Sequence, residues 1–179
     1  MKYWVESQIQ IDCNILFVKN YMILGIDPGV RKLWYALIKD DLTIVDAGIL
    51  LQHQKAPTRT DQFQRVVQIY DFFEKLIKKE KPECVCMEQL FFTKFNQSNA
   101  EFVYAIRWAL MMLFVKNNIQ VKEFTPIEVK KYITWNGKAD KKFVQKMVMK
   151  IYRLEEEPIY NDAADALAMA YIGKRNSTR

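Results

Sequence analysis

A short apolar segment that ends in an acid and a tight turn is the feature that most limits the folds open to this chain. Residues 22–27 read MILGID and are followed by Pro-Gly, which predicts a buried strand ending at Asp27. Segments 34–39 and 42–50 are also strand-like and flank a pair of aspartates, so they predict a hairpin. Together these segments predict a meander of antiparallel strands.

The hydrophobic period changes after this meander. Residues 61–80 repeat apolar side chains every three or four positions, which predicts an amphipathic helix. A strand over 83–88, a helix over 99–116 and a strand over 119–124 follow. Three more helices are predicted over 126–133, 140–152 and 161–172. This order predicts an α/β fold: a mixed five-stranded sheet, three antiparallel strands then two parallel ones, with helices on both faces.

The composition limits the cellular compartment and the kinds of metal site and disulfide that this chain can have. No apolar run approaches the roughly 20 residues that a membrane span needs, and no export or import signal is visible, so we expect a cytoplasmic protein. Cys84 and Cys86 would share one face of a strand, and an odd total of three cysteines argues against a disulfide framework. His53 is the single histidine, so a zinc site of His and Cys ligands is excluded. Any metal is expected to be held by oxygen.

The chain is moderately basic, with a net charge of +6, which is typical of a protein with a polyanionic partner. Much of the excess lies between residues 130 and 153. In the helix predicted over 140–152, Lys142, Lys146 and Lys150 form a row. This row lies away from an apolar face made by Phe143, Val144, Met147, Val148 and Ile151. Such a row is either a solvated helix face or a phosphate-binding surface, and its proximity to an acidic helix favours phosphate contact.

Four carboxylates stand where a core strand or helix is expected to be apolar. Asp27 and Glu88 end two predicted strands, and Asp162 and Asp165 lie three residues apart on an Ala-rich helix. Taken singly, each has an ordinary explanation as a turn residue, a solvated strand end or an acid favoured by a helix dipole. Because neighbouring parallel strands end at one sheet edge, and small residues let the helix approach it, we expect the four acids to converge.

Converging carboxylates repel one another unless they share protons or bind cations. Oxygen ligands of this kind suit Mg²⁺ or Mn²⁺. Two such ions roughly 3.5 to 4 Å apart promote phosphoryl transfer without a histidine base. The acids therefore predict metal-dependent phosphoryl transfer, with the ions activating a water and stabilising the leaving oxygen.

Four segments with special chemistry follow one another along the chain: LGIDPG (24–29), EQLFF (88–92), GKADK (137–141) and DAADALA (162–168). In this order they resemble the motifs of the RuvC Holliday-junction resolvases, within the ribonuclease H-like nucleases. The resemblance implies a ribonuclease H-like fold and a homodimeric endonuclease with two Mg²⁺ ions in each active site, for which Mn²⁺ can substitute, and no small-molecule cofactor. It also implies that the catalytic and metal-binding carboxylates are Asp27, Glu88, Asp162 and Asp165.

The same resemblance implies a surface for branched DNA. Lys130 and Lys141 match family lysines near the junction backbone, and Phe91 matches an aromatic residue that probes the opened junction centre. The other residues expected to contact DNA are Phe92, Lys94, Lys138, Lys142 and Lys146.

Two segments depart from the family pattern. RKLWYA (31–36) stands where the family usually has a hydroxyl residue and glycines, so Trp34 is expected to force a bulkier route beside the metal site. On the helix over 99–116, Arg107 precedes Trp108, where an Arg-Gly pair is common. That helix is apolar around its circumference, which predicts burial on two sides, as a subunit interface would provide.

The predicted function is therefore a structure-selective endonuclease that resolves four-way junctions by paired cuts, leaving 5′-phosphate and 3′-hydroxyl ends, in DNA recombination and repair. The alternatives are a non-catalytic junction-binding protein and a RuvC-like nuclease acting on other branched DNA. A DEDD-type transposase or an actin-like ATPase would need further domains. We expect a nuclease domain over 22–174, an N-terminal extension over 1–21 of unassigned role, and a short tail over 175–179.

Overall fold

Five strands form one mixed sheet in the order β3-β2-β1-β4-β5. The computed structural model describes residues 21–29, 31–51, 58–89, 97–155 and 163–177. Its elements are β1 (Met22–Asp27), β2 (Lys32–Lys39), β3 (Ile44–Leu51), α1 (Arg59–Glu80), β4 (Cys84–Glu88), α2 (Gln97–Lys116), β5 (Gln120–Phe124), α3 (Pro126–Thr134), α4 (Lys141–Tyr152) and α5 (Ala163–Ser177). Strands β1, β2 and β3 pair antiparallel, and β1, β4 and β5 pair parallel. The predicted α/β fold is confirmed.

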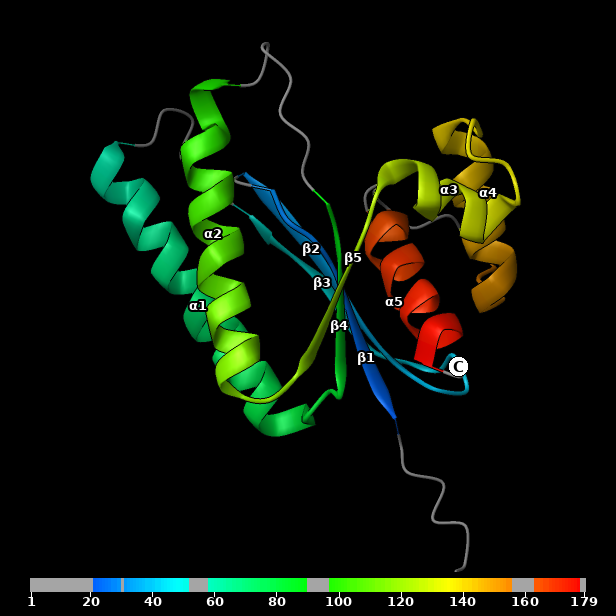
Figure 1. Ribbon diagram of the computed structural model, residues 1–179, viewed down its shortest axis with the longest axis horizontal. Coiled ribbons are helices and arrows are strands. Elements are labelled where there is room, and N and C mark those ends of the chain that lie inside the picture. The colour runs from blue at the N-terminus through cyan, green and yellow to red at the C-terminus, as the bar shows by residue number, and fades with distance from the viewer. Residues whose placement is uncertain (1–20, 30, 52–57, 90–96, 156–162, 178–179) are drawn as a thin grey trace, which may run out of the picture.

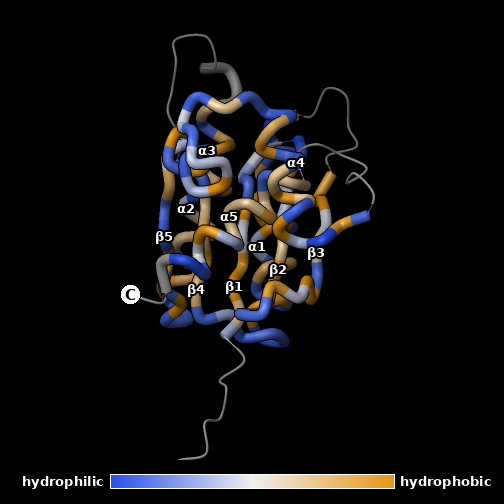
Figure 2. The backbone as a smooth tube through the Cα atoms, turned by 90° about the vertical axis from the view of Figure 1, so that its right-hand side faces the viewer, coloured by the Kyte–Doolittle hydropathy of each residue, from blue (hydrophilic) through white to orange (hydrophobic). Residues whose placement is uncertain are grey.

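Helices cover both faces of the sheet (Figure 1). Helices α1 and α2 lie on one face, and α3, α4 and α5 lie on the other. The alternation of side chains along the strands gives each face its own apolar core: Leu24 and Val85 pack toward α1 and α2, whereas Ile23 and Cys86 pack toward α5. Figure 2 looks onto the α5 side, where hydrophilic segments gather at the two ends of the strands.

Local signals explain where several helices begin. Thr58 and Thr125 form capping boxes with the third residue of α1 and α3, and Asp140 caps α4. Most predicted boundaries agree within two residues. Helix α5 is the exception, because it continues to Ser177, beyond residues 172 and 174, where the sequence predicted the helix and the domain to end.

Small residues bring α5 close to the sheet. A side chain at Gly25 of β1 would overlap the backbone of α5 at Ala166 and Ala170. A side chain at Gly173 would overlap Cys86 of β4 in the same way. The expectation that small residues let this helix approach the strands is thereby confirmed.

The two cysteines of β4 behave as predicted. Cys84 and Cys86 are buried free thiols on one face of the strand, with sulfur atoms 3.8 Å apart.

None of the helices in the described part of the chain has the length and apolar character of a bilayer span.

Candidate active site

Asp27 and Glu88 are the last residues of two adjacent parallel strands. The register of β1 and β4 pairs Ile26 with Met87, so the two acids each follow the last paired residues. They end the strands at the edge drawn uppermost in Figure 1, where α5 begins. The predicted placement of Asp27 beside Glu88 at one sheet edge is therefore observed.

The strand alternation also decides which face these acids occupy. Asp27 lies two residues after Gly25, which packs on α5, and Glu88 lies two residues after Cys86, which packs on the same helix. Residues two apart on a strand share a face. Both acids therefore belong to the α5 side of the sheet, and Asp165 lies in the first turn of α5.

Charges around Glu88 show that the acids and lysines form one electrostatic group. Burial raises the pKa of the Glu88 carboxyl, and the negative charge of Asp165 raises it further. Lys141 and Lys130 act in the opposite direction and lower the Glu88 pKa. Lys141 also forms an ion pair with Asp165, with 3.1 Å between nitrogen and oxygen. Thus Glu88, Asp165 and two lysines from α3 and α4 meet near the strand ends.

The donor set is suited to a hard divalent ion. Asp27, Glu88 and Asp165 offer carboxylate oxygens, the ligand type that Mg²⁺ and Mn²⁺ prefer. Within the described ranges, no three His, Cys, Asp or Glu side chains are already grouped closely enough to hold a metal. The fourth predicted acid, Asp162, lies outside the described residues. The described acids fit as part of an oxygen site, and the complete ligand set remains a prediction.

The residues predicted to contact DNA divide into two groups. Lys130 is partly buried near Glu88, and the others that the structure describes are exposed on α4 or just before it. These exposed lysines are Lys138, Lys141, Lys142 and Lys146. The predicted residues outside the described part of the chain are Phe91, Phe92 and Lys94.

The buried face of α4 differs from the predicted apolar face at Phe143 and at Gln145. Val144 and Val148 are buried, as predicted, opposite the exposed lysine row. Phe143 was expected on the same apolar face but is 45% exposed. Gln145, which was not predicted to lie on the apolar face, is 6% exposed.

Trp34, the bulky departure in the second strand, lies directly across the sheet from Asp27. Its side chain is only 4% exposed and packs in the core under α5. Directly opposed residues of antiparallel strands are close neighbours on one face. The indole therefore forms a wall beside the first acid, which agrees with the expected bulk next to the site.

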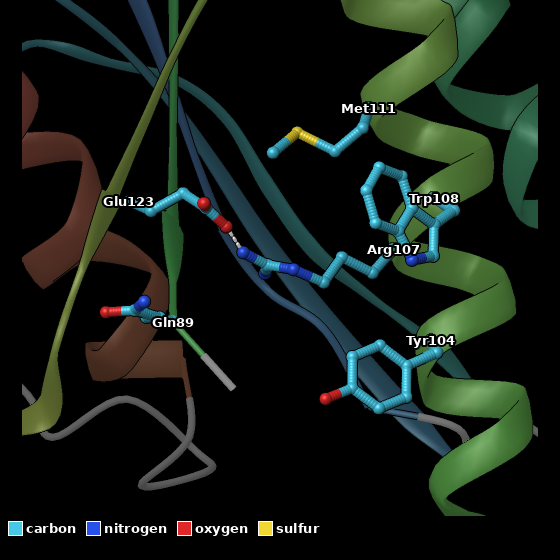
Figure 3. Close-up of a pocket in the computed structure, with 6 residues that line it drawn as sticks. All are labelled: Gln89, Tyr104, Arg107, Trp108, Met111 and Glu123. Atoms are coloured by element: carbon cyan, nitrogen blue, oxygen red, sulfur yellow. Dashed lines mark ion pairs between the residues drawn. The ribbon is translucent and has the colours of Figure 1, made fainter. Parts of the chain in front are cut away.

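One part of the site was missed by sequence reasoning. Arg107 of α2 is 8% exposed; its Nη1 donates to the backbone carbonyl of Glu88 at 3.0 Å, and its guanidinium also pairs with Glu123 of β5. Figure 3 shows this pair beside a cavity of about 200 Å³ lined by Gln89, Tyr104, Arg107, Trp108, Met111 and Glu123. An arginine in an apolar helix was the available signal, because a buried charge needs a partner.

Helix α2 leaves a row of large apolar side chains uncovered. Trp108, Met112 and Val115 are 64%, 70% and 66% exposed, while Ile106 and Leu110 are buried against the sheet. Within a single chain, α2 is therefore buried on the side that faces the sheet, whereas its other apolar side is exposed to solvent.

Comparisons with known proteins agree with this geometry. The family "Crossover junction endodeoxyribonuclease RuvC" matches residues 23–172. The RuvC of Fusobacterium nucleatum is 39% identical over 150 residues, which cover 82% of this chain and 76% of that protein. The RuvC of Caldicellulosiruptor saccharolyticus is 33% identical over 152 residues, covering 83% and 89%.

Solved structures give the same result. Thermus thermophilus RuvC superposes with a TM-score of 0.71 at 25% identity, covering 83% of this chain and 90% of that one. The T. thermophilus RuvC in complex with a Holliday junction substrate gives a TM-score of 0.70 at 25% identity, covering 84% and 90%. The chain therefore belongs to the RuvC family of crossover junction endodeoxyribonucleases.

Proposed function

We propose that this protein resolves four-way DNA junctions by hydrolysing one phosphodiester in each of two opposed strands. The observation that carries the proposal is the placement of Asp27 and Glu88 at adjacent strand ends, with Asp165 in electrostatic reach of Glu88, in a chain of the RuvC family. This arrangement joins acids from two strands and a helix at one edge. The products are 5′-phosphate and 3′-hydroxyl ends.

The residues that would hold divalent ions are Asp27, Glu88, Asp165 and Asp162. Bound Mg²⁺, or Mn²⁺ in its place, would polarise the attacking water and stabilise the leaving oxygen. The burial that raises the Glu88 pKa also strengthens the attraction of its ionised form for a cation. Lys141 balances part of the acid charge through Asp165, and its exposed ammonium can turn toward a phosphate when DNA arrives.

Lysines on α4 and before it would bind the arms of the junction. Lys138, Lys142 and Lys146 are exposed, and α4 begins with Lys141 beside Asp165. A phosphate backbone crossing this surface would run from the lysine row into the acid site. Phe91 is proposed to reach the centre of the junction, and Phe92 and Lys94 are proposed to contact the DNA.

Two cuts require two sites related by a symmetry like that of the junction. We propose a homodimer formed through the exposed face of α2, since a two-fold interface uses one self-complementary patch on both copies. Trp108, Met112 and Val115 supply such an apolar patch. Helix α2 lies on the sheet face opposite α5, so dimer formation leaves the α5 side open to DNA (Figure 1).

A junction-binding protein without activity is the second candidate. It has no use for acids that repel phosphates at the centre of a basic surface, and burial together with the charge of Asp165 raises the pKa of Glu88, so its ionised form is disfavoured there. Grouped acids are retained at such a cost where they serve chemistry.

The test is cleavage of synthetic four-way junctions, three-way junctions, flaps and linear duplex, each with and without Mg²⁺. We expect paired nicks on the four-way junction only with the metal, and no cuts by Asp27→Asn. Cutting of the other branched substrates at the same rate would favour a general branched-DNA nuclease. Junction binding without cleavage under every metal condition would favour the non-catalytic alternative.

A further inference from the structure

We propose that Arg107 is a positioning residue for the cleavage reaction: it holds the end of β4, and with it Glu88, between α2 and β5. The inference rests on the proposed function for its kinetic consequence. Its structural part, a strand end fixed by a guanidinium from the opposite sheet face, is independent of that function.

The contacts of Arg107 span three elements. Its Nη1 donates to the carbonyl oxygen of Glu88 at 3.0 Å, and Nη2 pairs with the carboxylate of Glu123 on β5. Figure 3 shows the side chain extending from α2 to the strands, with the ion pair at its tip. A planar guanidinium presents donors in a fixed fork, so one group can serve both acceptors at once.

The strand end is also tied to β5 through its backbone. The amide of Gln89 donates to the carbonyl of Phe124 at 2.8 Å, directly after Glu88. The residue carrying the acid is thus held by β5 on one side and by Arg107 from α2. Since Arg107 contacts the main chain of Glu88 and not its carboxylate, it acts on the position of the acid.

Burial of the Arg107 side chain favours keeping both of its contacts. Arg107 is 8% exposed, and a charge removed from water is tolerated only with partners that satisfy it. Loss of either acceptor would leave a buried donor, so the arrangement resists change. Carboxylates that hold metal ions must stay within about 0.5 Å of their working geometry, which is the reason to fix this strand end.

The next residue on α2 is Trp108, which belongs to the exposed apolar row. Arg107 therefore connects the helix proposed as the dimer interface to the strand that carries Glu88. A shift of α2 would therefore move the Arg107 side chain and, through its hydrogen bond, the end of β4 that carries Glu88.

The chain offers a matched control in Arg65. It is 6% exposed, lies on α1 beside α2, and its guanidinium donates to the backbone carbonyl of Leu50 near the end of β3. It makes the same kind of buried bond to a strand end, but β3 is the far edge strand of the sheet and carries none of the proposed ligands.

The experiment compares Arg107→Met, Arg107→Lys and Arg65→Met in the full chain. Hydrogen exchange of the metal-free proteins reports on residues 84–89, and junction cleavage in Mg²⁺ gives kcat and KM. For Arg107→Met we expect several-fold faster exchange at 84–89, a kcat at least tenfold lower and a KM within twofold. Arg107→Lys keeps the positive charge but loses the paired donors of the guanidinium. Its kcat should therefore lie between that of the parent and that of Arg107→Met. Arg65→Met should lose thermal stability while keeping the parent kcat and the parent exchange at 84–89.

The outcomes separate the two proposals. A parent protein that cuts no junction makes the proposed function wrong. A parent that cuts, together with Arg107 variants that keep its kcat or lose it only as much as Arg65→Met, overturns the positioning role alone. Should Arg107→Met fail to fold, folded Arg107→Lys with parent kcat and parent exchange has the same meaning.

Discussion

The ammonium of Lys141 lies 3.1 Å from the carboxylate of Asp165, which joins the start of α4 to the first turn of α5. The two side chains are 54% and 28% exposed, so the pair contributes no more than about 1 kcal/mol to stability. Its importance is local. It brings a cation next to Asp165 and within electrostatic reach of Glu88, because Asp165 raises and Lys141 lowers the pKa of Glu88.

Removing the charge of one acid should stop cleavage without unfolding the protein. Asp27→Asn, Glu88→Gln, Asp162→Asn and Asp165→Asn keep the side-chain size but weaken metal binding, which contributes several kcal/mol to phosphoryl transfer. We expect cleavage to fall at least about 100-fold. Junction binding should persist or tighten, since fewer negative charges face the phosphates.

Gel-shift binding and nicking assays on the same variants check this prediction, with Ca²⁺ as a metal that should support binding without efficient cutting. Thermal melting should show little change for Asp165→Asn and an equal or higher melting temperature for Glu88→Gln without metal. An Asp27→Asn protein that nicks junctions at the parent rate would reduce Asp27 to a turn residue.

Charges on the outer face of α2 should dissociate the dimer. Trp108→Lys and Met112→Lys alter side chains that are 64% and 70% exposed in one chain, so the fold of the monomer should be unaffected. Sedimentation at micromolar concentration should give a dimer for the parent and a monomer for both variants. Val67→Lys on α1, where the side chain is 58% exposed, is the control and should remain dimeric. A parent that is monomeric even with DNA would contradict the proposed interface.

The lysine row of α4 should contribute to the salt dependence of junction binding. Lys142→Ala and Lys146→Ala should each reduce the slope of log affinity against log salt by about one for a lost phosphate contact. Titrations between low and moderate salt measure the slope. Lys75→Ala on α1, an exposed position on the other side of the sheet, should leave it unchanged. An unaltered slope for the α4 variants would make this row a solvated helix face.

Stability at high pH should depend on Tyr35. Burial, followed by the charge of Asp46 and a hydrogen bond to it, raises the pKa of the Tyr35 phenol from 10.0 to about 12. The folded state therefore keeps its proton longer than the unfolded state, and the contribution of Tyr35 is complete below pH 10 and lost as pH rises toward 12. In Tyr35→Phe, the free energy of unfolding measured by urea should fall less across this range. Equal pH dependence of the two proteins would contradict the assignment.

Much of the fold could be predicted from local patterns. The apolar run before Asp27 and the capping residue Thr125 each specify an element through nearby residues alone, and β1 and α3 begin and end within a residue of their predicted bounds. The placement of Asp27 beside Glu88 could be inferred too, because neighbouring parallel strands end on the same side of a sheet. The length of α5 could not be inferred from the sequence. Its last turns continue the packing of Gly173 against β4, which is a contact between residues far apart in the chain.

The order of the elements, the strand-end acids and the family motifs follow from the amino-acid sequence alone, because each depends on residue type and spacing along a few turns or strand repeats. Which charged side chains meet depends on how distant segments fold together. Arg107, Glu88 and Glu123 belong to three separate elements, and nothing in the spacing of these residues shows that a guanidinium from α2 reaches the ends of β4 and β5. The physical reason is that a buried charge is paired by the folded arrangement of distant segments, whereas a helix or a strand is specified by neighbours in the chain.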